Sequence, residues 1–140
     1  MAAGVIDPLI WGMVVDHAKL MKQKQMLIED LQNHLFEQTE VMGLDLGTVN
    51  MQRGRDHGLA GYSAWRGFCG LSQPQTIEEL SEVLGNPEVA KKFMNVYGTL
   101  YNTDFWTGAA AEPVVPQGRV GPLLSCTIGT QFRNLCDGDR

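Results

Sequence analysis

Residues 50 to 58 read Asn50-Met-Gln-Arg53-Gly-Arg55-Asp56-His57-Gly58. This stretch is the most informative part of the sequence for predicting the fold and the site. The residues before it predict a short helix over about 44–53, which runs into a polar segment. A helix places residues three apart on one face, so Asn50 and Arg53 are expected to point to one wall of a pocket. The alternative is that the two side chains only cap the helix or form a salt bridge.

On both sides of this segment, helical periodicity and frequent Gly and Pro residues predict an all-α chain. Thr76 followed by Glu79 is a capping-box pattern, which is typical of a helix start. Gly85-Asn86-Pro87 then separates two helices, because Pro87 suits the first turn of the second one. The expected helices cover about residues 17–38, 44–53, 62–68, 76–84, 87–97 and 122–135, with a loop-rich segment over 99–117.

The expected helix over 17–38 is amphipathic, with Asp16 as its N-cap. Leucines form one stripe, at Leu20, Leu27, Leu31 and Leu35, and polar residues occupy the other side. A helix of this kind needs a surface on which to pack its apolar stripe.

The composition excludes some classes of protein. The 140 residues are 44% hydrophobic and 19% charged, which is ordinary for one folded domain. A net charge of −5 argues against a nucleic-acid surface. No apolar run approaches the roughly 20 residues that cross a bilayer, so no membrane partner is expected. Residues 1–8 lack the basic and long apolar regions of a signal peptide.

The cysteines and histidines give weaker signals. Cys69, Cys126 and Cys136 are an odd number, so at most one internal disulfide forms and the pairing stays open on counting alone. His17 and His34 lie too far apart to share a metal, and neither has a partner at a recognisable ligand spacing. We therefore expect no metal ligand among these residues.

Several blocks, taken together, keep an order and a spacing that resemble the animal haem peroxidase family, within it the group of myeloperoxidase, eosinophil peroxidase and lactoperoxidase. The resemblance covers essentially the whole chain. The blocks lie at residues 4–8, 18–20, 44–46, 50–58, 61–66, 68–71, 111–113, 118–124 and 137–140.

The resemblance implies a fold and a chemistry. The fold would be an incomplete all-α domain, with residues 1–140 forming part of the C-terminal half of the catalytic domain. In the family, hydrogen peroxide oxidises a haem iron, which then takes electrons from halides, thiocyanate or small organic donors. Hydrogen peroxide, these donors and haem are therefore the implied partners and cofactor.

The resemblance also implies roles for individual residues. Asn50 would hydrogen-bond the outer ring nitrogen of the histidine that binds iron, which orients the ring and tunes the iron. Arg53 would lie near a haem propionate, where a guanidinium suits a carboxylate. Leu46 and Val49 would line the same side of the haem. His57 would belong to a polar loop network with Arg55 and Asp56 and would not bind iron.

Other family residues have no match in this sequence. The proximal histidine, the distal histidine and arginine, the haem-tethering carboxylates and the calcium loop all match segments upstream of Met1. No residue here is therefore assigned a catalytic role, and we expect the chain alone to be inactive and not to bind haem stably. The missing part of its own domain is an expected partner.

The resemblance further implies a disulfide between Cys69 and Cys126, which leaves Cys136 as a free thiol. It also implies a secreted or granule protein, because the relatives are found there. An alternative function is a non-catalytic, truncated isoform that packs on another chain through the helix over 17–38. We expect the sequence to be part of a longer chain, incomplete at both ends.

Overall fold

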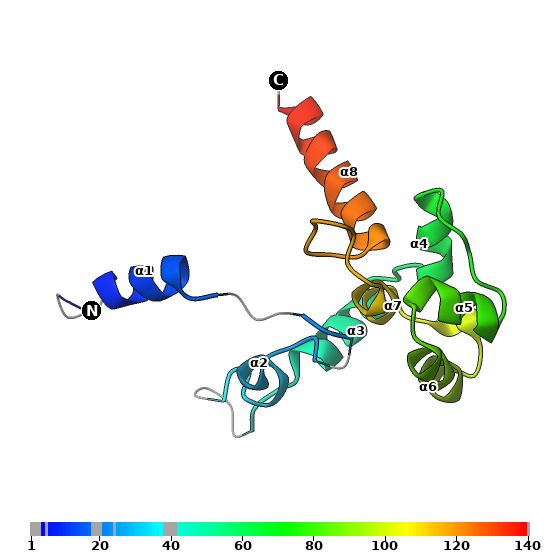
Figure 1. Cartoon of the computed structure of the whole chain (residues 1–140), viewed down its shortest axis with the longest axis horizontal. Helices are drawn as coiled ribbons and strands as arrows, with labels where there is room; N and C mark the ends of the chain where they lie inside the picture. The colour runs from blue at the N-terminus through cyan, green and yellow to red at the C-terminus, as the bar shows by residue number, and fades with distance from the viewer. Residues whose placement is uncertain (1–3, 5, 18–20, 24, 38–41, 140) are drawn as a thin grey trace.

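The computed structural model describes residues 4, 6–17, 21–23, 25–37 and 42–139 (Figure 1). In these residues every regular element is a helix, and β-structure is limited to two isolated bridges, Lys22↔Gln25 and Leu35↔Leu44. The predicted all-α class is confirmed. The helices are α1 (Ile6–Val15), α2 (Glu29–Asn33), α3 (Leu46–Asp56), α4 (Tyr62–Phe68), α5 (Ile77–Leu84), α6 (Pro87–Tyr97), the 3-10 helix η1 (Leu100–Asn102), α7 (Phe105–Ala111) and α8 (Pro122–Gly138).

The helices α5 and α6 start where the sequence predicts, at the capping box of Thr76 and Glu79 and at Pro87. The hydroxyl of Thr76 accepts a hydrogen bond from the backbone N–H of Glu79 at 3.2 Å. The Glu79 carboxylate accepts from the N–H of Gln75, at 2.7 Å, one residue before the expected cap position. Asn86 caps α6 in the same manner, and Pro87 occupies its first turn.

The helix predicted over 17–38 is wrong for the residues that the structure describes. Only α2 is helical in this range, and residues 18–20, 24 and 38 lie outside the described part of the chain. The side-chain amide of Gln23 donates to the carbonyls of Leu84, at 2.6 Å, and Ala111, at 2.8 Å. These bonds hold the segment against the ends of α5 and α7, so long-range contacts override the local leucine period.

Three helices, one of them a 3-10 helix, appear where the sequence predicted none. The segment over 99–117, which was predicted to be loop-rich, contains η1 and α7. In α7, a Cβ atom built on Gly108 would lie 2.4 Å from the ring of Tyr62, so this glycine permits a close approach of α7 to α4. The other unpredicted helix, α1, has no buried residue.

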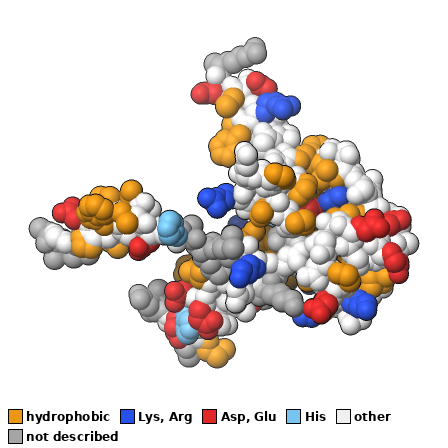
Figure 2. Space-filling model, in the orientation of Figure 1, with side chains coloured by type: hydrophobic (Ala, Val, Ile, Leu, Met, Phe, Trp, Pro, Cys, Tyr) orange, Lys and Arg blue, Asp and Glu red, His pale blue; other side chains and the backbone are white. Residues whose placement is uncertain are grey.

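The core lies between α4, α5, α6, α7 and the start of α8, whereas α1 and most of α8 extend away from it (Figure 1). The buried hydrophobic residues are Tyr62, Leu80, Leu84, Val89, Ala90, Phe93, Leu100, Ala109, Ala111 and Leu123. Hydrophobic side chains cover much of α1 in Figure 2, and Leu9, Ile10 and Trp11 of this helix are exposed. None of the described helices is both long and apolar enough to cross a membrane.

A disulfide joins Cys69, directly after α4, to Cys126 in α8, with a Cα–Cα distance of 6.1 Å. This is the pairing that the family resemblance implied. Cys136, near the end of α8, is a free and exposed thiol.

Candidate functional site

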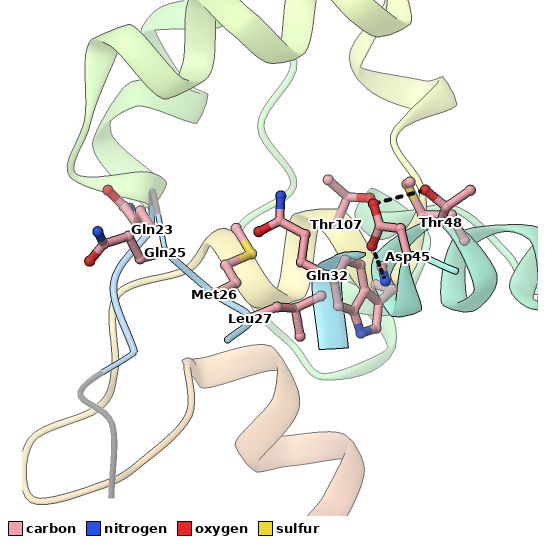
Figure 3. A pocket seen from close by; sticks show the side chains of 11 residues that line it. Gln23, Gln25, Met26, Leu27, Gln32, Asp45, Thr48 and Thr107 are labelled. Atoms are coloured by element: carbon pink, nitrogen blue, oxygen red, sulfur yellow. Dashed lines mark hydrogen bonds between the residues drawn. The ribbon is translucent and has the colours of Figure 1, made fainter. Parts of the chain in front are cut away.

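The first turn of α3 is fixed by its N-cap residue, Asp45. One carboxylate oxygen accepts a hydrogen bond from the N–H of Gly47 at 2.8 Å, and the other accepts from the hydroxyl of Thr48 at 3.1 Å (Figure 3). Such a cap satisfies helix donors that would otherwise lack partners. The direction of α3, and with it the position of Asn50 and Arg53, is therefore set by local hydrogen bonds.

A pocket of about 280 Å³ lies beside this turn, between residues 23–32, α3 and α7 (Figure 3). Its polar lining includes Gln23, whose amide is already bonded to two backbone carbonyls. The amide oxygen of Gln23 also accepts from Asn86 at 2.9 Å. Gln23 therefore links the segment before α2 to the ends of α5 and α7 and to the start of α6.

Asn50 and Arg53 line a larger pocket of about 490 Å³, together with His57, Phe105, Trp106 and two smaller neighbours. Asn50 is half-buried and Arg53 is exposed. Among the described residues, neither side chain makes a hydrogen bond or an ion pair, so the structure does not show the alternative in which they cap or bridge. We call this pocket the α3 pocket.

Leu46 and Val49, the apolar positions that the resemblance assigned to the same side, are half-buried in α3. Neither residue lines the α3 pocket. The structure therefore places Asn50 and Arg53 at one pocket, whereas Leu46 and Val49 lie outside its lining.

The polar segment after Arg53 does not form the expected shared network. Arg55 pairs with Asp104 through two hydrogen bonds, of 3.0 and 2.7 Å. Asp56 accepts from Gln52 at 3.0 Å, and the Nδ1 atom of His57 lies 2.8 Å from the carbonyl oxygen of Arg53. The three side chains have separate partners because Arg55 reaches across to the start of α7.

This ion pair positions the opposite wall of the α3 pocket. Asp104 directly precedes Phe105 and Trp106, and it also accepts a hydrogen bond from the hydroxyl of Tyr97 at 3.0 Å. The hydrogen bond from Arg55 holds the pKa of the Asp104 carboxyl below its ordinary value. Burial raises the pKa of Tyr97. Asp104 is therefore ionised at neutral pH and joins α3, α6 and α7.

A second polar cluster, which the sequence did not predict, lies in the core. Glu112 pairs with Arg66 and accepts hydrogen bonds from the hydroxyl of Tyr62 and the N–H of Leu123, both at 2.8 Å. Arg66 also donates to Ser72. Burial is the main cause that raises the pKa of Tyr62. The sequence signal that could have indicated this cluster is a single acidic residue, Glu112, within the otherwise apolar stretch 108–115.

The described residues contain no group of three or more His, Cys, Asp or Glu side chains that could hold a metal ion. His34 contacts Glu37 at 2.8 Å and not a second histidine.

Comparison with known proteins decides the family. The model of the animal haem peroxidase family matches residues 1–140. The chain belongs to the animal haem peroxidase family. Human eosinophil peroxidase is 55% identical over 137 residues, and mouse myeloperoxidase is 56% identical over 137 residues. Each match covers 98% of this chain and 19% of the relative, so the chain spans about a fifth of these peroxidases.

A solved structure shows the same fold. Peroxidase A from Dictyostelium discoideum is 34% identical to this peroxidase chain, with a TM-score of 0.66. The match covers 76% of this chain and 20% of that chain. The residues described here are therefore a partial domain of the haem peroxidase fold.

The side chains of the α3 pocket fit one edge of the haem that the family name implies. An exposed guanidinium that has no partner among the described residues suits a carboxylate such as a propionate, and an amide three residues away can bond a ring nitrogen. The Nδ1 atom of the only histidine in this lining, His57, faces a backbone carbonyl. The donor set therefore fits a wall of the cofactor site without its iron ligand.

Proposed function

We propose that this chain forms the wall beside the iron-binding histidine in a peroxidase that reduces hydrogen peroxide and oxidises halide, thiocyanate or small organic donors. The observation that carries the proposal is the shared α3 pocket of Asn50 and Arg53, whose side chains have no partner among the described residues. Family membership supports it. When bound, the haem supplies the redox chemistry.

In this proposal, Asn50 orients the histidine that binds iron by a hydrogen bond to its outer ring nitrogen. Such a bond fixes the ring and tunes the ligand's basicity. Arg53 would hold a haem propionate, because its guanidinium suits a carboxylate. Phe105 and Trp106 of α7 line the same pocket and would shield this side of the haem from water. No residue of this chain breaks the O–O bond.

The 140 residues alone are inactive in this proposal, because they supply neither the iron ligand nor the distal acid and base. A direct test adds haemin to the purified chain and measures oxidation of an organic donor by hydrogen peroxide. We expect no turnover above that of free haemin. Turnover well above this background would overturn the statement.

Asn50 is tested in a grafted peroxidase, in which residues 1–140 replace the matching part of human eosinophil peroxidase. We expect Asn50→Ala to shift the haem absorption band and to lower turnover by roughly 10–100-fold. Gln52→Ala is the matched control, because Gln52 lies on the same helix but bonds Asp56 outside the pocket. Equal spectra and rates for the two variants would contradict the role of Asn50.

We also infer a secreted or granule location. The Cys69–Cys126 disulfide supports it, because such bonds persist in oxidising compartments. Mass spectrometry of the protein from its native tissue, after thiol alkylation without reductant, tests this. A reduced pair would contradict it.

A second candidate function is a truncated isoform that binds another protein. The observation that favours it is the exposed apolar surface of α1, where Met13 is 84% and Val14 77% exposed. Exposed apolar patches of this kind usually indicate a partner or aggregation. The helix over 17–38, which the sequence suggested as the docking element, does not form in the described residues. Size-exclusion chromatography separates a defined complex from aggregates.

A further inference from the structure

The last turns of α8 contain a three-residue pattern that the proposed function does not use. Asn134 is followed by Leu135 and Cys136. An asparagine two positions before a serine or threonine, with any residue except proline between them, is the acceptor signal for an N-linked glycan in secreted proteins. A cysteine thiol can replace the hydroxyl, because it also donates and accepts hydrogen bonds, although weakly. Asn134-Leu135-Cys136 therefore matches the cysteine form of this signal.

The sequence contains no second acceptor signal of this kind. The remaining asparagines all lack Ser, Thr and Cys two positions later, and they are Asn33, Asn50, Asn86, Asn95 and Asn102. An N-linked glycan on residues 1–140 would therefore be attached at Asn134, which makes the site easy to assign by experiment.

The thiol of Cys136 is in the chemical form that the signal requires. A cysteine in a disulfide has no S–H group and could not replace a hydroxyl. The other two cysteines, Cys69 and Cys126, are joined to each other. Cys136 is left free and exposed. The disulfide pairing of the fold thus keeps the third position of the signal available.

The surroundings of Asn134 leave space for a glycan. Every residue over 131–139 is exposed, and α8 extends away from the core towards this end (Figure 1). Within the part of the chain that the structure describes, no group forms a hydrogen bond with the side-chain amide of Asn134. Attachment of a sugar to this amide would therefore break no hydrogen bond of the described residues.

The helical conformation of α8 sets a condition on the transfer. A helix turns by about 100° per residue, so Asn134 and Cys136 point to different faces of α8. An enzyme that contacts both side chains at one site needs this segment before the helix forms or after its end has opened. Opening should be easy, because the one buried residue of α8, Leu123, lies at the other end of the helix.

We propose that Asn134 is an N-glycosylation site, which accepts an oligosaccharide from a lipid-pyrophosphate donor. The amide nitrogen of Asn134 forms a bond to the anomeric carbon of the first sugar and loses one proton. The bond between that carbon and the pyrophosphate oxygen breaks, and the lipid pyrophosphate leaves with its electron pair. The inference rests on the proposed secreted or granule location, because such transfer occurs in the secretory pathway.

The test measures the glycan on one peptide of the grafted peroxidase, secreted from animal cells. An amidase first releases N-linked glycans in heavy-oxygen water, which converts a glycosylated asparagine into a labelled aspartate. Trypsin then frees residues 134–140, because Arg133 and Arg140 precede its two cleavage points. We expect the labelled peptide from the parent protein. Cys136→Ala keeps the asparagine but removes the thiol, and it should abolish the label.

Cys136→Thr tests the third position in the opposite direction. A hydroxyl forms stronger hydrogen bonds than a thiol, so we expect the labelled fraction to rise by at least about twofold. Because residue 136 is exposed, neither substitution should disturb the fold, and equal haem uptake by the variants checks this. A parent protein without the label would overturn the proposal, whether or not Cys136→Thr carries it. A label that persists in Cys136→Ala would overturn it too.

The redox state of Cys69 and Cys126 in the native tissue separates this inference from the proposed location. A secreted grafted peroxidase without the glycan refutes the glycosylation of Asn134 and leaves the location intact. A reduced Cys69–Cys126 pair in the native protein contradicts the location, and the glycosylation inference fails with it, even where the grafted peroxidase carries the glycan. Neither result bears on the role of Asn50.

Discussion

The carboxylate of Glu112 lies 2.8 Å from the hydroxyl of Tyr62, although 50 positions separate the two residues in the sequence. The same carboxylate pairs with Arg66 and accepts from the N–H of Leu123. One buried acidic side chain thereby connects α4, the end of α7 and the start of α8.

Removing this carboxylate should be strongly destabilising. We expect Glu112→Ala to lower the free energy of unfolding by about 3–5 kcal/mol, because Arg66 stays buried without its partner. Tyr62→Phe removes one hydrogen bond and should cost about 1 kcal/mol. Urea unfolding of the 140-residue chain measures both. Equal losses for the two variants would show that the ion pair is not the dominant link.

Gly108 allows α7 to approach α4, and a methyl group there should be costly. In Gly108→Ala the new Cβ would meet the ring of Tyr62, which is 1% exposed and cannot move aside freely. We expect a loss of about 1–3 kcal/mol from this overpacking. Gly129→Ala is the control, because a Cβ there meets nothing within 4 Å, and it should stabilise α8 by up to about 1 kcal/mol. Thermal unfolding of both variants checks the opposite signs.

The disulfide between Cys69 and Cys126 spans 57 positions. Loop-closure entropy predicts that its loss costs on the order of 4 kcal/mol, mainly by freeing the unfolded chain. We expect Cys69→Ser with Cys126→Ser to lower the urea midpoint accordingly, whereas Cys136→Ser leaves it unchanged because that thiol is exposed and free. A small effect of the double variant would mean that the unfolded chain is already compact.

Local signals predicted the middle of the chain well. Thr76 and Pro87 act through the residues next to them, so the starts of α5 and α6 could be predicted from the sequence. The α3 helix and the common pocket of Asn50 and Arg53 also follow from spacing along one helix. These features depend on few contacts beyond their own neighbourhood.

Long-range contacts explain what the sequence did not predict. The leucine stripe over 17–38 favoured a helix, but Gln23 instead bonds backbone carbonyls more than 60 positions away. The α7 helix approaches Tyr62 closely at Gly108, and no local pattern reveals this contact. The partners of Arg55 and Glu112, 49 and 46 positions from them, are hidden for the same reason.

The pair of Arg55 and Asp104 predicts a pH dependence. Because the folded-state pKa of Asp104 is lowered from its ordinary value of 3.8, its contribution to stability is complete above that value and is lost as the pH falls below it. Asp104→Asn should therefore lose less stability than the parent chain between pH 5 and pH 3. Urea midpoints at both pH values measure this, with Asp137→Asn at the exposed end of α8 as control. An identical acid loss in the parent and in Asp104→Asn would contradict the prediction.

Arg53 and Arg55 lie two positions apart on α3, yet their surroundings predict opposite effects of the same substitution. Arg55 makes two hydrogen bonds to Asp104, so Arg55→Gln should lower the urea midpoint of the 140-residue chain. Arg53 has no side-chain partner among the described residues, so Arg53→Gln should change the free energy of unfolding by less than about 0.5 kcal/mol.

In the grafted peroxidase we expect a different result for Arg53→Gln. Loss of a charge-assisted bond to a propionate should speed the release of haem to an acceptor protein by roughly 10- to 150-fold, since one such bond contributes about 1.5–3 kcal/mol. A side chain that is dispensable for folding but needed to retain haem has a binding role. The opposite result would be that Arg53→Gln destabilises the isolated chain as much as Arg55→Gln does, while the rate of haem release stays unchanged. Arg53 would then be a structural residue, and the assignment of the α3 pocket to the propionate would be wrong.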